Sequence, residues 1–204
     1  MDGYELRAEC YRRLNKTAKK GAVVLAGSSL CEGFPVNELL MSRGESLPVY
    51  NRGISGDTIP GYHSRIGDCV IDLAPRKLFI NIGTNDMNGG ENGADEICAN
   101  YSALLKEIMA KLPGCEIFVL SHYPINPEVH ARSPWQSGRT NERIAQINGR
   151  VRAMAEQMGL KWLDVSTPLM DENGDLRAEL TMDGVHMYPD AYEIVLDVLL
   201  PYMR

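Results

Sequence analysis

Apolar residues along the chain gather in short runs, each about as long as a β-strand. The runs are AVVLAG (22–27), LPVYNRG (47–53), KLFINIG (77–83), EIFVLSHY (116–123) and LKWLDV (160–165). Their apolar residues follow one another without a regular polar alternation, which is typical of strands that helices cover on both faces of a sheet. The pattern therefore predicts five buried parallel strands.

Between and after these runs, apolar residues recur at helical spacing. One face comprises Ile97, Tyr101, Leu104, Leu105, Ile108 and Leu112, and a second comprises Ile144, Ile147, Val151, Met154 and Met158. A closing helix is predicted from Pro189, and an N-terminal helix over about residues 2–20. Helices that connect parallel strands by right-handed crossovers produce a three-layer α/β/α sandwich. We expect a single domain over residues 1–204 with the flavodoxin-like strand order 2-1-3-4-5, and a Rossmann-like order is the alternative.

The composition disfavours several classes of protein. Lys and Arg number 21 against 27 Asp and Glu, and the net charge of -6 argues against a nucleic-acid partner bound through phosphates. The five cysteines contain no C-x-x-C pair, which indicates neither a disulfide framework nor a zinc site. No apolar segment is long enough for a signal peptide or a membrane span, so we expect a cytoplasmic protein without a membrane partner, unless a leader has been removed. No cofactor is expected, and a homo-oligomer is left open.

Polar and glycine-rich segments follow the predicted strands, at the edge where ligands bind in open α/β sheets. They are Gly27-Ser28-Ser29, NRGISGDT (51–58), IGTNDMN (82–88) and, before the closing helix, TMDGVHMYPD (181–190). Together they supply a hydroxyl, backbone N–H groups, a carboxamide, an imidazole and a carboxylate. Acyl transfer needs this set of groups, so the sequence predicts a catalytic site at the rim of the sheet.

A serine nucleophile needs a base, and the base needs a partner that fixes its tautomer. Asp183 and His186 are three residues apart, so their side chains can lie on the same side of the chain. The alternative is a simple turn followed by a packed or capping histidine. Gly56 and Asn85 are candidates to donate N–H groups to an oxyanion. An ordinary turn glycine and an Asx turn or helix cap are the alternatives for these two.

The four segments in this order resemble the SGNH or GDSL-type hydrolases, which are esterases and acylhydrolases with a flavodoxin-like sheet. The resemblance covers nearly the whole chain and is greatest to the platelet-activating-factor acetylhydrolase-like branch. It implies that Ser29 is the nucleophile and that Asp183 and His186 complete a catalytic triad. It also implies an oxyanion hole formed by Ser29, Gly56 and Asn85.

Two positions depart from familiar motifs. The aspartate usual before the nucleophile is Ser28 here, and Cys31 stands where a G-x-S-x-G motif has its second glycine. Cys31 is also an alternative nucleophile if a helix N-terminus lowers the pKa of its thiol. A further alternative is a divalent metal held by Asp183, His186 and Asp190.

The remaining candidates would contact the substrate. His122 and Tyr123 follow the fourth strand and are predicted to bind substrate, and loop packing is the alternative for His122. Tyr123, Trp135 and Tyr188 are candidates to line an acyl or sugar pocket, and core or interface packing is the alternative for each of them. We expect residues 122–139, where three prolines break any regular pattern, to form an irregular loop that selects the substrate.

The resemblance implies a reaction as well as a site. We expect serine-dependent hydrolysis of a small acyl ester, acetyl or short-chain, of a carbohydrate or a lipid-like alcohol. The partner is then a small-molecule ester. The alternative is a non-catalytic flavodoxin-like module that binds an anionic or nucleotide ligand at helix N-termini.

Overall fold

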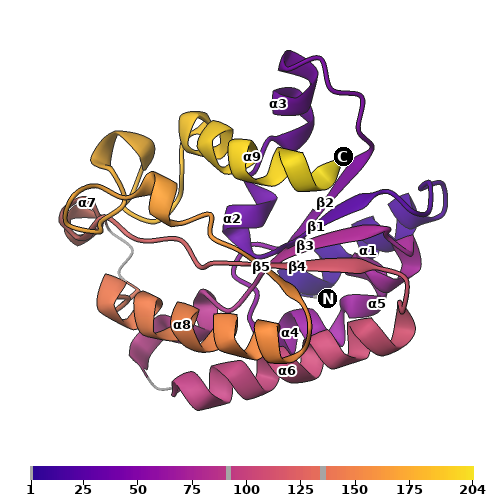
Figure 1. The fold of residues 1–204 in the computed structure, drawn as a ribbon, viewed down its shortest axis with the longest axis horizontal. Helices are drawn as coiled ribbons and strands as arrows, with labels where there is room; N and C mark the ends of the chain where they lie inside the picture. Colours follow the sequence, from indigo (N-terminus) through magenta and orange to yellow (C-terminus); the bar gives the residue numbers. More distant parts are fainter. Residues whose placement is uncertain (1, 91–92, 134–136) are drawn as a thin grey trace.

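The computed structural model describes residues 2–90, 93–133 and 137–204, and its elements form three layers (Figure 1). The middle layer is a parallel sheet of five strands in the order β2-β1-β3-β4-β5. The strands are β1 (Val23–Gly27), β2 (Val49–Gly53), β3 (Lys77–Asn81), β4 (Glu116–Leu120) and β5 (Lys161–Leu163). Each strand lies within its predicted run. The flavodoxin-like order is confirmed, and the Rossmann-like alternative is wrong.

Helices pack on both faces of this sheet (Figure 1). One face is covered by α2 (Ser29–Glu32), α3 (Val36–Ser42) and α9 (Pro189–Met203). The other is covered by α1 (Gly3–Asn15), α4 (Ile59–Ser64), α5 (Ile66–Cys69), α6 (Ala94–Lys111) and α8 (Asn141–Gln157). The remaining helices are α7 (Pro127–Arg132) and the short η1 (Ile71–Leu73), η2 (Asn85–Gly90), η3 (Thr167–Leu169) and η4 (Ala178–Leu180). None of the described helices combines the length and the hydrophobicity needed to cross a bilayer.

The unbroken apolar runs have a direct structural cause. In β1, Val24 and Ala26 pack into the core on the α6 side, whereas Val23 and Leu25 pack into the core on the α9 side. All four are at most 2% exposed. Because successive side chains of a strand point to opposite faces, a strand buried on both faces has no position for an exposed polar residue.

The N-terminal helix is shorter than the predicted span of residues 2–20. It ends at Asn15, which is buried and donates from Nδ2 to the backbone oxygen of Asp68 at 2.7 Å. The tertiary contact of Asn15 fixes the last turn, and the lysine-rich residues beyond it lead into β1. Tyr11 donates to the backbone oxygen of Gly53 at the end of β2, so α1 packs against the chain's own sheet.

The segment predicted to be irregular contains a helix. α7 begins at Pro127, and the side chain of Asn126 accepts the backbone N–H of Val129 at 2.9 Å. Proline is well suited to a first helical turn because that turn needs no intrahelical N–H donor. The prediction of an irregular segment is therefore wrong at Pro127, because this proline marks the start of a helix.

Candidate active site

The first strand leads into the site through a sharp turn. β1 ends at Gly27, and Ser29 is the first residue of α2. A Cβ atom on Gly27 would lie 2.2 Å from the backbone oxygen of Asn81 in β3 and 2.9 Å from the Cβ atom of Cys31. Only glycine fits at this turn, which holds Ser29 at the carboxyl rim of the sheet.

Ser29, His186 and Asp183 form one hydrogen-bonded series. Ser29 Oγ lies 3.1 Å from His186 Nε2, and His186 Nδ1 lies 2.6 Å from Asp183 Oδ2. An ionised carboxylate can only accept, so Nδ1 carries the proton and Nε2 presents its lone pair to the serine hydroxyl. The imidazole is therefore oriented to take a proton from Ser29. The structure brings together the three residues that the sequence predicts as a triad.

The carboxylate of Asp183 is held by the turn that follows it. Asp183 Oδ1 accepts the backbone N–H groups of Val185 at 2.9 Å and His186 at 2.7 Å. Burial raises the pKa of Asp183, but the hydrogen bonds from the His186 ring and from these backbone groups outweigh burial and bring the pKa below its usual value. Gly184 adopts a φ of +88°, and a Cβ atom there would lie 2.5 Å from the backbone nitrogen of His130. Asp183 is thus ionised at neutral pH and fixed beside the ring.

Three residues at the pocket carry N–H groups that can donate hydrogen bonds. The N–H of Ser29 opens α2, and the first N–H groups of a helix have no partner within the helix. Gly56 lies in the loop after β2 with a φ of +79°, and Asn85 is the first residue of η2 after β3. All three residues line one pocket. The arrangement can donate hydrogen bonds to negative charge that develops on an oxygen next to Ser29.

The pocket has a volume of about 480 Å³, a typical size for a small-molecule site. It is lined by Ser29, Glu32, Gly33, Ser55, Gly56, Asn85, Met182, His186, Met187 and Tyr192. Met187 and Tyr192 are buried and form an apolar wall of the pocket. Met182, a further apolar lining residue, is 54% exposed. The pocket is therefore lined both by polar groups and by apolar surface.

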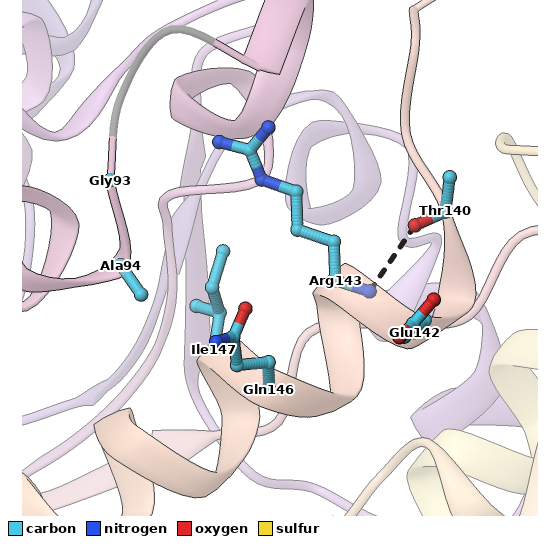
Figure 2. Close-up of a pocket in the computed structure, with 7 residues that line it drawn as sticks. All are labelled: Gly93, Ala94, Thr140, Glu142, Arg143, Gln146 and Ile147. Carbon is cyan, nitrogen blue, oxygen red and sulfur yellow. Dashed lines mark hydrogen bonds between the residues drawn. The ribbon is translucent and has the colours of Figure 1, made fainter.

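A second pocket of about 580 Å³ lies between the first turns of α6 and α8 (Figure 2). It is lined by Gly93, Ala94, Thr140, Glu142, Arg143, Gln146 and Ile147. Figure 2 shows the backbone N–H of Arg143 donating to Thr140 Oγ1, a helix cap with a distance of 3.2 Å. Among these described lining residues there is no serine, cysteine or histidine, so the larger pocket lacks the groups for acyl transfer.

The structure contradicts substrate contact by His122 and Tyr123. His122 is fully buried and Tyr123 is 4% exposed, and neither lines the pocket at Ser29. His122 Nε2 lies 2.9 Å from the backbone oxygen of Ile82, and the other ring nitrogen, Nδ1, lies 2.9 Å from Asn148 Oδ1 in α8. The imidazole therefore joins the ends of β3 and β4 to α8 in the interior. Loop packing was the correct alternative for His122.

Cys31, Tyr188 and Asp190 do not line the pocket at Ser29. Cys31 is 8% exposed, burial raises the pKa of its thiol, and its Sγ faces Asn51 Oδ1 at 3.4 Å, so it is not placed to act as a nucleophile. Tyr188 is 43% exposed and does not line the pocket. Trp135 lies outside the described residues. Within residues 2–90, 93–133 and 137–204, no group of three or more His, Cys, Asp or Glu side chains could hold a metal ion.

Two charged residues that contact this site were missed by the sequence analysis. Glu32 Oε2 accepts the backbone N–H and the hydroxyl of Ser55 at 2.7 and 2.5 Å, and Glu32 Oε1 pairs with Arg7 Nη2 at 2.6 Å. Glu32 thus ties the loop before Gly56 to α1. Arg139 Nη2 donates to Asn85 Oδ1 at 2.9 Å. The spacing of Glu32 three residues after Ser29 was an available signal, because such residues share one side of a helix.

A Gly56→Ala variant is expected to lose activity through the backbone. A φ of +79° strains any residue with a Cβ atom, and the new methyl group would lie 2.9 Å from the Tyr4 hydroxyl. Relief of this strain turns the N–H of residue 56 away from the pocket. We expect kcat for p-nitrophenyl acetate to fall by up to about 10²-fold, as for a weakened oxyanion donor.

Gly44→Ala is the matched control for this variant. Gly44 has a φ of +70° with nothing within 4 Å of a Cβ atom, and it lies outside the pocket. It therefore reproduces the backbone strain without touching the site. Thermal unfolding should show a loss of stability in both variants. Only Gly56→Ala should have a lowered kcat for p-nitrophenyl acetate. Equal kcat values for the two variants would show that the N–H of Gly56 does not bind the oxyanion.

The profile of the GDSL-like lipase/acylhydrolase family matches residues 26–194. A Streptococcus pneumoniae structure, provisionally named a platelet activating factor, is 28% identical, has a TM-score of 0.89 and aligns over 99% of this chain and 93% of its own. No curated protein matches the chain.

Two further structures share the fold at lower identity. A GDSL-like lipase from Bacteroides thetaiotaomicron is 24% identical, with a TM-score of 0.79 and 96% of each chain covered. An acetylxylan esterase from Geobacillus stearothermophilus is 20% identical, with a TM-score of 0.68, and the alignment covers 92% of this chain and 96% of that one. At these identities the likeness is one of fold.

A flavodoxin-like sheet that carries a Ser, His and Asp series at its carboxyl rim defines a class of carboxylester hydrolases. The chain belongs to the GDSL-like lipase/acylhydrolase family, whose profile covers most of its length. The resemblance predicted from the four motifs is thereby confirmed, and the Streptococcus pneumoniae structure agrees with the predicted branch.

Proposed function

We propose that Ser29 is the nucleophile in the hydrolysis of a small acyl ester. The observation that carries this proposal is the 3.1 Å contact between Ser29 Oγ and His186 Nε2, with Asp183 on the far side of the ring. Ser29 Oγ attacks the carbonyl carbon while its proton passes to His186 Nε2. Asp183 holds the ring and stabilises the imidazolium that forms.

The carbonyl oxygen becomes negatively charged in the tetrahedral intermediate. The N–H groups of Ser29 and Gly56 and the carboxamide of Asn85 donate to it. Collapse of the intermediate breaks the ester C–O bond, and the leaving alcohol takes the proton from His186 Nε2. Water then attacks the acyl-serine with His186 as base, and release of the acid restores Ser29.

A short acyl group suits the fixed wall of the pocket. Tyr192 donates to the backbone oxygen of Leu30 at 2.9 Å and stacks on Phe34 with 4.8 Å between ring centroids. A side chain held in this way yields little to a long acyl chain. The polar Glu32 and Ser55 line the same pocket as the exposed Met182. This supports a carbohydrate or a lipid-like alcohol as the leaving group.

Two of the three structures compared above support the same range of substrates. One is provisionally named a platelet activating factor, and the other is an acetylxylan esterase. Acetyl is the acyl group that the second name specifies. We therefore propose acetyl or a short-chain homologue as the acyl group of the substrate.

Hydrolysis of p-nitrophenyl acetate, butyrate and octanoate tests the proposal. We expect kcat/KM to be greatest for acetate and to fall with chain length, because the wall formed by Tyr192 limits the acyl space. An acetylated xylose and an acetylated monoalkylglycerol then compare the two classes of alcohol. A protein that hydrolyses none of these esters is the non-catalytic binding module instead, and fastest turnover of octanoate contradicts the short acyl group.

A further inference from the structure

The proposed role of Asn85 depends on which end of its carboxamide faces the pocket. The two ends have nearly the same shape, but only the –NH₂ end donates hydrogen bonds. An oxygen turned toward a developing oxyanion would repel it. An enzyme that uses this side chain must therefore fix its rotation.

Two hydrogen bonds fix the rotation of the Asn85 carboxamide, one that it donates and one that it accepts. Asn85 Nδ2 donates to the backbone oxygen of Asp57 at 2.8 Å, and that oxygen can only accept. Asn85 Oδ1 accepts from Arg139 Nη2 at 2.9 Å, and a guanidinium can only donate. A flipped carboxamide would lose both bonds and place like groups against each other. Nδ2 carries two hydrogens, of which one is donated to Asp57, and Asn85 lines the pocket at Ser29.

Arg139 is itself held firmly. It is 5% exposed, and its Nε donates to Asn88 Oδ1 at 2.8 Å while Nη2 contacts Asn85. Burial lowers the pKa of Arg139 to about 10, against the opposing effect of the Asp183 charge, so the guanidinium is protonated at neutral pH. Asn85 and Asn88 both belong to η2, so the planar guanidinium of Arg139 donates hydrogen bonds to this short helix at two positions.

We propose that Arg139 is a positioning residue that locks and polarises the carboxamide of Asn85 for oxyanion binding. A cation on the carbonyl oxygen draws electron density from the amide, which makes the remaining N–H of Nδ2 a stronger donor. The inference rests on the proposed function, because it assigns Arg139 a part in the same oxyanion hole. It also gives the 122–139 segment a role in catalysis through its last residue rather than through substrate selection alone.

Kinetics of Arg139→Met with p-nitrophenyl acetate test the assignment. The oxyanion forms only after the substrate is bound, so we expect kcat to fall about 10- to 100-fold while KM changes less than about threefold. Arg139→Lys keeps a cationic donor but not the planar fork, and it should recover part of the lost kcat. Arg152→Met is the control, because the Arg152 side chain is 61% exposed in α8, pairs with Glu156 and does not line the pocket at Ser29. This control should keep wild-type kinetics.

A double-mutant comparison separates an effect of Arg139 through Asn85 from a nonspecific disturbance of the structure. If Arg139 acts through Asn85, its substitution should have almost no further effect on kcat in an Asn85→Ala background. The same comparison is made with Arg139→Lys if the methionine variant does not fold. Equal losses in both backgrounds, or a loss confined to KM, would overturn the assignment. Full kcat in Arg139→Met would do so as well.

Failure of the proposed function gives a different result. A fluorophosphonate should label wild-type Ser29 whatever the contribution of Arg139. Absence of labelling and of ester hydrolysis in the wild type refutes the proposed function. A labelled and active wild type with an equally active Arg139→Met variant refutes the role of Arg139 alone.

Discussion

The Ser29→Ala variant is expected to lose at least about 10⁴-fold in kcat for p-nitrophenyl acetate, because the oxygen that carries the acyl group is gone. In the wild type, Ser29 Oγ lies 3.1 Å from His186 Nε2, and in this variant His186 faces only the methyl group of alanine. Water activated by His186 in the same pocket gives only slow residual turnover. Labelling by a fluorophosphonate, followed by intact mass, should disappear in this variant.

Ser28 and Cys31 provide controls on either side of this residue. The Ser28 side chain makes no capping hydrogen bond to α2, and Cys31 is buried with a raised pKa. Alanine at either position should leave kcat within about tenfold of the wild type, with any loss of stability read from thermal unfolding. Full activity of Ser29→Ala together with an inactive Cys31→Ala would reverse the assignment. A chelator should leave the reaction unchanged.

The fold could be predicted from the sequence because both faces of the sheet are buried. That burial leaves the middle positions of β1, β3 and β4 apolar, so these runs can be identified from the sequence without knowing which strands pair. The end of α1 could not be predicted in this way. It depends on Asn15 reaching Asp68, a contact between residues that are 53 positions apart. Helical spacing alone continues through the polar residues after Asn15 and has no signal for that contact.

The triad could be predicted because each of its residues follows a strand or precedes the last helix, and these points meet at one rim. His122 also follows a strand, yet it lies in the interior. Its side chain is covered by α8, whose Asn148 accepts the His122 backbone N–H at 2.8 Å. Position after a strand therefore identifies the rim but not the direction of a side chain. The contacts of Arg139 with Asn85 and of Glu32 with Ser55 are likewise long-range pairs, and the residue types alone indicate only a charged surface.

The Asp183→Asn variant should lower kcat by about 10⁴-fold with little change in fold. The oxygen of the new carboxamide can still accept the backbone N–H groups of Val185 and His186, so the turn is preserved. The –NH₂ group of that carboxamide then faces His186 Nδ1 and donates to it. The ring is driven to the tautomer with the proton on Nε2, which cannot accept the proton of Ser29. Asp190→Asn, in the exposed first turn of α9, is the matched control and should keep wild-type kinetics.

The same substitution should change how stability depends on pH. The folded-state pKa of Asp183 is lower than its unfolded value, so its ionised form stabilises the fold above the unfolded pKa. This contribution is lost as the pH falls through the folded-state pKa. The difference in Tm between the wild type and Asp183→Asn should therefore be largest near neutral pH and shrink below about pH 4. Unchanged kinetics in Asp183→Asn would remove Asp183 from the triad, and a Tm difference that grows in acid would show that its carboxylate does not stabilise the turn.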